Sequence, residues 1–282
     1  MGEISYPGEG TSLCSQCGRH WGTGQNFCPE CGYFSAGTCA PELGAPADRA
    51  GQRMGAVAWG GWQIAAGIIV VMISLFAAAA AAFAIGSLYP EQQDAVATWI
   101  SVHLMGLAIV ATVWYLGLRH SRDPLAVLRL SGVQWPRKRT ILLMFGVLAA
   151  SLIATSIYSG IVEWLDLDQF ATPDVDSDIF FDGPAVLLTF QALAFITPIS
   201  EELFFRGFIF RGLLPKMGPW GAIAASALVF SGFHLSLGVL VPIFITGFLL
   251  AWLYWRTGSL WAAIGAHAGQ NALALGVQAL AG

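Results

Sequence analysis

Charged side chains are scarce in this chain of 282 residues: they make up 11% of it, whereas hydrophobic residues make up 56%. A soluble domain is usually about a quarter charged and about 45–50% apolar, so this composition excludes an ordinary soluble protein. The 13 basic and 17 acidic residues give a net charge of −4, and we expect no nucleic-acid partner. The composition instead predicts the lipid bilayer as the main partner of the chain.

Two further absences narrow the interpretation. No long apolar run occurs in residues 1–50, so we expect the first apolar segment to be an uncleaved membrane anchor and not a secretory signal. The chain also lacks the H-E-x-x-H motif that marks the usual helix of a zinc protease. A metal in the membrane part would therefore need another set of ligands.

Cysteine is confined to the first 39 residues, where four of the five cysteines form two C-x-x-C-G pairs in "CSQCGRHWGTGQNFCPECG". Four thiolates at this spacing can bind Zn²⁺ tetrahedrally, and the glycine after each pair permits a tight turn. Two disulfides are the alternative, but the paired knuckles favour zinc. The stretch resembles the short zinc ribbons of many bacterial proteins, and a closed Cys₄ site indicates a structural or protein-docking role. The predicted zinc ligands are Cys14, Cys17, Cys28 and Cys31, within a ribbon at 1–34 that a flexible linker, 35–58, follows.

The rest of the chain predicts an all-α bundle that crosses the membrane about seven times. We divide it into N-terminal spans, 59–183, and a more polar membrane core, 184–282. The fourth span is interrupted by Thr197-Pro198, which predicts a kink or a break there. The apolar runs long enough to span are 62–88, 96–118, 140–162, 184–214, 219–237, 239–255 and 260–280.

Loop charges predict the orientation of these spans. The loop 119–139 carries six Lys or Arg residues against one acid, whereas the loop 163–182 carries seven acids and no Lys or Arg. Basic loops face the cytoplasm. We therefore expect a multi-pass protein of the cell membrane with its N-terminus in the cytoplasm, where thiols stay reduced, and its C-terminus outside.

Ionisable residues inside a span are costly, so each one is a candidate for function. Glu202 and Arg206 are four residues apart and can pair on one helix face, whereas Glu201 is rotated by about 100° and is free to face a cavity. His267 and Asn271 also lie four residues apart, on the last span. If Pro198 only starts a helix, both glutamates could simply interact favourably with the positive end of the helix dipole. This would not explain why histidines occur in the later spans.

The rise per residue of an α-helix shows whether Glu201, His234 and His267 can lie at the same depth in the membrane. At about 1.5 Å per residue, Glu201 lies roughly 22 Å from Lys216, and His234 lies roughly 21 Å from Trp220. Glu201 and His234 can thus lie at the same level. His267 is only about 10 Å from Leu260, so the last helix must tilt, or Pro198 must kink, for it to join them.

A carboxylate and imidazoles in a low-dielectric cavity can activate water. Glu201 is the candidate base and His234 the candidate partner on the same water. His267 and Asn271 could donate hydrogen bonds to a tetrahedral oxyanion. Hydrolysis of a peptide bond is the reaction that these roles fit best.

Three motifs occur in order on the later spans: E-E-x-x-x-R at 201–206, F-x-x-x-H from Phe230 to His234, and H-x-x-x-N at 267–271. This arrangement resembles the CPBP family, the CAAX proteases and bacteriocin-processing or self-immunity proteins also called Abi. The resemblance covers about residues 184–280. It implies a glutamate-dependent or metal-dependent intramembrane endopeptidase with Glu201, His234, His267 and Asn271 as catalytic residues. Glu202, Arg206 and Phe230 would support them.

Some alternatives stay open at this point. Glu201, His234 and His267 could supply three zinc ligands, but a base would then be missing, so we expect no catalytic metal. The substrate could be a prenylated or bacteriocin-like peptide or a membrane protein, and the ribbon could bind a protein partner. A non-catalytic immunity or scaffold protein is the first rival function, and a proton-coupled transporter is the second.

Overall fold

The computed structural model describes residues 11–13, 20–22, 54, 57–131, 138–173 and 176–281. The chain divides into two compact units, Met1–Ala58 and Trp59–Gly282. In the first unit, strands β1 (Thr11–Leu13) and β2 (His20–Gly22) pair in antiparallel fashion. All four predicted zinc ligands lie outside the described residues, so the zinc ribbon stays a prediction.

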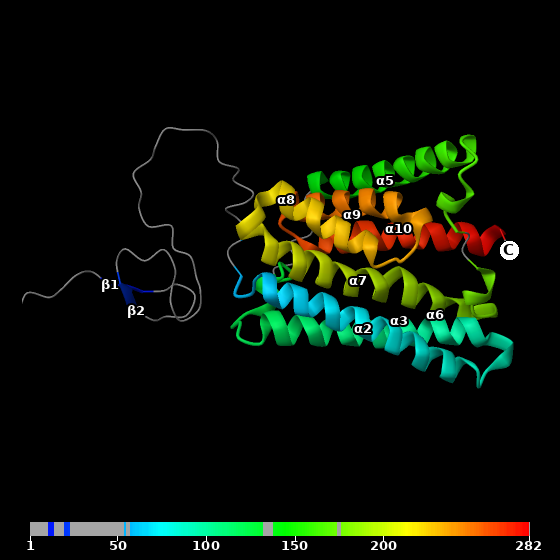
Figure 1. The fold of residues 1–282 in the computed structure, drawn as a ribbon, viewed down its shortest axis with the longest axis horizontal. Coiled ribbons are helices and arrows are strands. Elements are labelled where there is room, and N and C mark those ends of the chain that lie inside the picture. The colour runs from blue at the N-terminus through cyan, green and yellow to red at the C-terminus, as the bar shows by residue number, and fades with distance from the viewer. Residues whose placement is uncertain are drawn as a thin grey trace, which may run out of the picture. The chain divides into compact units, whose positions relative to one another are not determined.

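The second unit is helical in its described part, and its long helices lie side by side in one bundle (Figure 1). Stretches of π-helix at Gln191–Ile196 and Leu203–Phe210 join α6, α7 and α8 into one continuous helical run. A third π-helical stretch, Trp114–Leu118, extends α3. The α-helices are α2 (Gly61–Gly86), α3 (Gln93–Val113), α4 (Pro124–Val127), α5 (Lys138–Trp164), α6 (Val186–Phe190), α7 (Thr197–Glu202), α8 (Arg211–Gly232), α9 (Leu237–Thr257) and α10 (Leu260–Ala281).

Five stretches of the described chain are long and apolar enough to cross a membrane, which makes the chain a multi-pass membrane protein. One of them, Gly183–Gly232, contains most of the predicted fourth and fifth spans. Its backbone leaves helical geometry at Gly218, which has a φ of 65° and lies between Pro215 and Pro219. The α10 helix is not among the five, and its polar residues, His267 among them, lower its hydropathy. The predicted count of seven spans stays a prediction.

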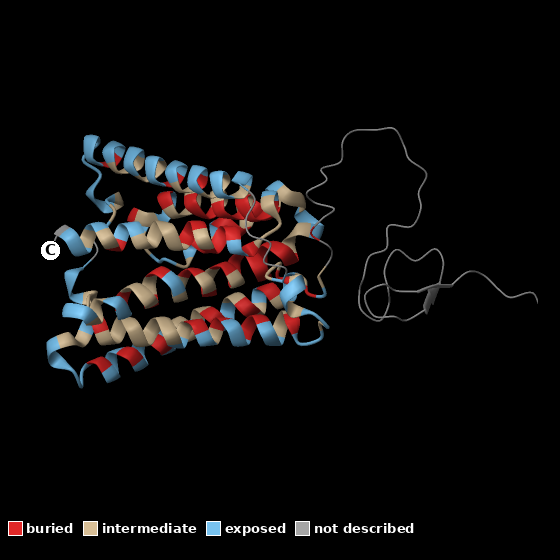
Figure 2. Cartoon of the chain, turned by 180° about the vertical axis from the view of Figure 1, so that it is seen from behind, coloured by how far each residue is buried: buried red, intermediate tan, exposed pale blue. Residues whose placement is uncertain are grey.

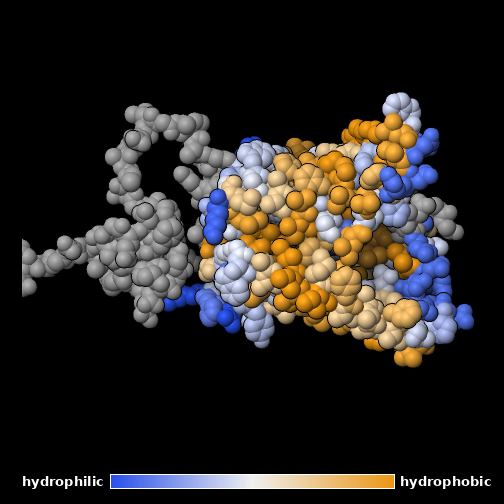
Figure 3. All heavy atoms as spheres, in the orientation of Figure 1, coloured by the Kyte–Doolittle hydropathy of each residue, from blue (hydrophilic) through white to orange (hydrophobic). Residues whose placement is uncertain are grey.

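The outside of the bundle is apolar, as contact with lipid requires. Side chains such as Ile73 on α2 and Phe145 on α5 are 64% and 65% exposed. Figure 3 shows an apolar band between two more hydrophilic ends. Buried residues gather toward the interior of the bundle (Figure 2), and α8, α9 and α10 contribute many of them.

The predicted interruption at Thr197-Pro198 takes the form of a widened turn. Proline has no N–H to donate, and the π-helical stretch Gln191–Ile196 ends directly before Thr197. The Thr197 hydroxyl donates to the carbonyl of Ala192 at 3.2 Å, which satisfies one backbone acceptor of this stretch. The run therefore continues through Pro198 into α7, which carries both glutamates.

Candidate active site

Glu202 and Arg206 form the predicted pair at the end of α7. Arg206 Nη1 donates to Glu202 Oε1 at 2.7 Å, and both side chains are fully buried. Arg206 also donates through Nη2 to the carbonyl of Gly247 on α9 at 2.9 Å. Its guanidinium lies over the ring of Phe230, 4.5 Å from the centroid. Each charge is thus compensated inside the bundle, and Arg206 ties the π-helical stretch Leu203–Phe210 to α9.

His267 of α10 lies between the two glutamates. Its Nδ1 is 2.9 Å from Glu202 Oε1, and its Nε2 is 3.7 Å from Glu201 Oε2. An ionised carboxylate only accepts hydrogen bonds, so Nδ1 is the donor toward Glu202 and Nε2 faces Glu201. The packing of α10 against α7 therefore brings His267 to the depth of the glutamates, which the helix count alone could not establish.

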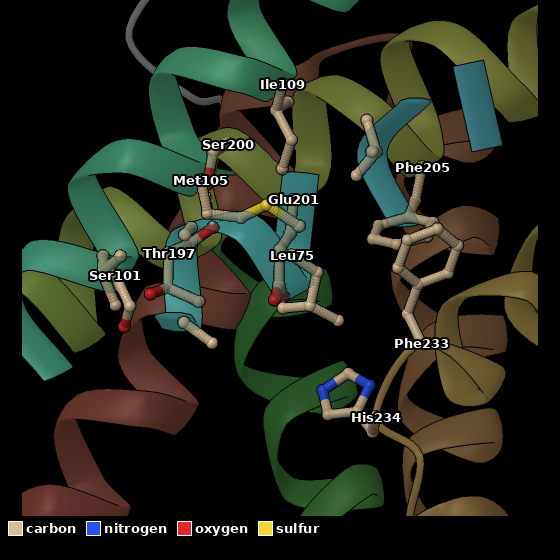
Figure 4. Close-up of a pocket in the computed structure, with 14 residues that line it drawn as sticks. Leu75, Ser101, Met105, Ile109, Thr197, Ser200, Glu201, Phe205, Phe233 and His234 are labelled. Carbon is tan, nitrogen blue, oxygen red and sulfur yellow. Dashed lines mark hydrogen bonds between the residues drawn. The ribbon is translucent and has the colours of Figure 1, made fainter. Parts of the chain in front are cut away.

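Glu201 takes the other direction and lines a cavity of about 240 Å³ together with His234 (Figure 4). His234 lies in the turn that follows α8, and its Nδ1 is 3.0 Å from the carbonyl of Phe230. Because a carbonyl only accepts, Nδ1 is the donor in this contact, which leaves Nε2 as an acceptor. One glutamate is thus held in a buried pair while its neighbour reaches the cavity.

Phe230 fixes the spacing between the two histidines. Its ring meets His234 and His267 edge-to-face, with centroids 5.1 Å and 5.9 Å apart. A third edge-to-face contact, at 4.9 Å, joins it to Phe205. Phe230 is 2% exposed, so this packing holds both imidazoles from one side.

Gly247→Ala should destabilise the protein by about 1–3 kcal/mol, because an added methyl overpacks a well-filled core. A Cβ at this position would lie 2.8 Å from the Phe230 ring and 3.3 Å from Ala227 Cα. Gly276→Ala is the control, since a Cβ there meets nothing within 4 Å. Thermal unfolding in detergent measures both, and equal midpoints for the two variants would contradict the tight packing around Phe230.

Asn271 and His103 make contacts away from the cavity. The Asn271 amide donates to the carbonyl of Leu193 at 2.9 Å, which joins α10 to the π-helical turn before α7. The two ring nitrogens of His103 contact the carbonyl of Trp99 and the side chain of Gln191. His103 is thus a bonded packing residue, and the oxyanion role of Asn271 stays a prediction.

Sequence motifs did not identify the walls of the cavity on α2 and α3. Leu75, Ala78 and Ala79 come from α2, and Met105 and Ile109 come from α3. These are ordinary apolar residues in apolar helices, so only the packing of the helices distinguishes them from lipid-facing neighbours.

The candidate metal ligands of the membrane core do not gather around one point. Within the described ranges, no group of three His, Cys, Asp or Glu side chains has an arrangement that could hold a metal ion. His234 lines the cavity, whereas His267 binds Glu202 outside the cavity lining. The absence of a catalytic metal stays a prediction.

Zinc content tests the ribbon and the cavity separately. We expect one zinc per purified chain, because the four cysteines are predicted to form one closed site. Cys28→Ser combined with Cys31→Ser should remove it, whereas His234→Ala and His267→Ala should leave it unchanged. Elemental analysis of the four proteins gives the result. A zinc content that falls with either histidine would place metal in the membrane core.

Residues 183–273 match the family model described as type II CAAX prenyl endopeptidase Rce1-like. This segment of the chain is therefore similar to the CAAX prenyl endopeptidases. This family is one of proteases, which supports an enzymatic activity for the chain. The matched segment carries both glutamates and both histidines of the site, whereas α2, α3 and α5 lie outside it. No curated protein and no solved structure matches the chain.

Proposed function

We propose that the chain is an intramembrane endopeptidase in which Glu201 activates water for the hydrolysis of a peptide bond. The observation that carries this proposal is the difference between two adjacent glutamates. Glu202 is fully buried and bound by Arg206 and His267, whereas Glu201 lines a cavity that also contains His234. A general base must reach the proton that it removes, and only Glu201 of the pair faces such a space.

The proposed reaction uses one water molecule. Glu201 accepts a proton from it while His234 orients it, and the resulting hydroxide bonds to the carbonyl carbon of the substrate. The tetrahedral oxyanion forms at this stage. The proton then passes to the amide nitrogen, the C–N bond breaks, and a new carboxylate and a new amine leave.

The remaining polar residues position these groups. His267 contacts both glutamates and would hold Glu201 at the edge of the cavity. The second amide N–H of Asn271 is the donor left for an oxyanion, because the other Asn271 N–H binds the carbonyl of Leu193 and the ring N–H of His267 donates from Nδ1 to Glu202. Arg206 donates to Glu202 Oε1, the same oxygen that His267 Nδ1 contacts, and so would help to keep His267 in place.

We place the enzyme in the cell membrane with its N-terminus in the cytoplasm and its C-terminus outside. The substrate is a peptide or membrane protein whose scissile bond reaches the bundle interior. The Cys₄ ribbon would bind structural zinc and dock a protein partner.

The test compares protein termini in membranes from cells that express wild type, Glu201→Gln or His234→Asn at matched levels. Both variants should lose the same set of termini, because both residues act on one water. Glu163→Gln is a matched control, since it removes an exposed carboxylate at the end of α5. Loss of different sets by the two variants would contradict the shared water.

A further inference from the structure

Two of the four residues of α2 that line the cavity are alanines. Residues 76–83 read "FAAAAAAF", and Ala78 and Ala79 of this run line the cavity together with Val71 and Leu75. Met105 of α3 and Leu75 also line the cavity, and both reach toward Glu201 (Figure 4). The side chains on this wall therefore decide how much room is left beside Glu201.

Close contacts hold this wall in place. On α2, a Cβ at Gly67 would lie 2.8 Å from the ring of Phe208, so the helix backbone packs directly on the core. On α3, a Cβ at Gly106 would lie 3.4 Å from Ile196, just before α7. Trp59 adds a hydrogen bond of 2.9 Å to the carbonyl of Phe208. Because both helices are anchored, a larger side chain on α2 would reduce the cavity and not simply push the helix away.

The cavity also reaches the lipid-facing surface of α2. Ala79 lines it and is itself exposed. The large side chains at the two ends of the alanine run, Phe76 and Phe83, are 60% and 65% exposed on an apolar helix. The cavity lining therefore includes a residue on the outer, apolar face of α2.

We propose that Ala78 and Ala79, with Met105, select the substrate by leaving room for one bulky apolar side chain next to the bond that Glu201 cleaves. The substrate segment enters sideways from the hydrocarbon region past Ala79. This inference rests on the proposed proteolytic function, and it assigns specificity to helices outside the segment that the family model matches. A hydrophobic pocket discriminates by about 10–200-fold per methylene.

The experiment records the residues on either side of each new terminus in membranes from cells expressing wild type, Ala79→Leu or Ala80→Leu. Termini that depend on Glu201 are those absent from Glu201→Gln membranes. In wild type, Leu, Ile, Met or Phe should flank these bonds. In Ala79→Leu, cleavage beside large residues should fall at least tenfold relative to cleavage beside Gly, Ala or Ser. Ala80 is exposed and does not line the cavity, so Ala80→Leu should keep the wild-type profile.

Different results would contradict substrate selection by α2 and the proteolytic function itself. In one outcome, wild type yields Glu201-dependent termini whose flanking residues do not change in Ala79→Leu. This result would contradict selection of the substrate by Ala79 but would leave the proposed proteolysis supported. If wild type yields no such termini, the proposed function fails and the wall with it. Ala79→Val is scored in the same way and serves if Ala79→Leu does not accumulate in the membrane.

Discussion

Replacing Glu201 with glutamine is expected to lower the rate of product formation by a factor on the order of 10²–10⁴, the usual contribution of a general base. Glutamine has nearly the same size and still accepts a hydrogen bond, but it cannot take a proton from water. Glu201 is outside the buried Arg206 pair, so the variant should fold as wild type does. The measurement is the rate at which Glu201-dependent termini accumulate after expression is induced.

Two variants control this result. Glu163→Gln loses one carboxylate from an exposed position and should keep the full rate. Glu201→Asp retains the carboxylate but withdraws it by one methylene, so it should retain more activity than Glu201→Gln. Equal activity of Glu201→Gln and wild type would show that another group activates the water.

Arg206→Met is expected to have the largest effect on stability. It removes the cation from a fully buried carboxylate, and loss of one partner of a buried pair costs about 3–5 kcal/mol. It also removes the hydrogen bond that ties the π-helical stretch Leu203–Phe210 to the Gly247 carbonyl of α9. The free energy of unfolding in mixed micelles should fall by that amount, and much of the protein should fail to accumulate.

The double variant Glu202→Gln/Arg206→Met separates charge from packing. Glutamine leaves no buried charge to compensate, and its carbonyl oxygen still accepts from His267 Nδ1, as Glu202 does in the native site. The double variant should therefore be more stable than Arg206→Met alone. If the two variants are equally unstable, the loss comes from the packing of Arg206 and not from an uncompensated Glu202.

Local spacing predicted some of the site correctly. Glu202 and Arg206 are one helical turn apart, so their pairing follows from helix geometry, and the rotation of Glu201 away from Glu202 follows from the same geometry. The position of His267 could not be derived in this way. It depends on how α10 packs against α7, which is a long-range property that no short stretch of sequence encodes.

In the membrane segments too, some features follow from local sequence and others depend on long-range packing. Apolar length predicted that α2, α3 and α5 are helices that could span, because hydropathy is a local sum. It did not predict the π-helical stretches on either side of α7, which accompany Pro198 and the packing of Leu203–Phe210 in the core. The position of Ala79 in the cavity wall also could not be predicted, because the sequence does not distinguish an alanine that faces a cavity from one that faces lipid.

The most direct test of the central claim compares all protein termini in membranes carrying wild type with those carrying Glu201→Gln at the same level. We expect a set of new termini, in matched carboxyl and amino pairs, that only wild type produces. Identical termini in the two membranes, with both proteins folded, would contradict proteolysis by Glu201 and would favour a non-catalytic immunity or scaffold role.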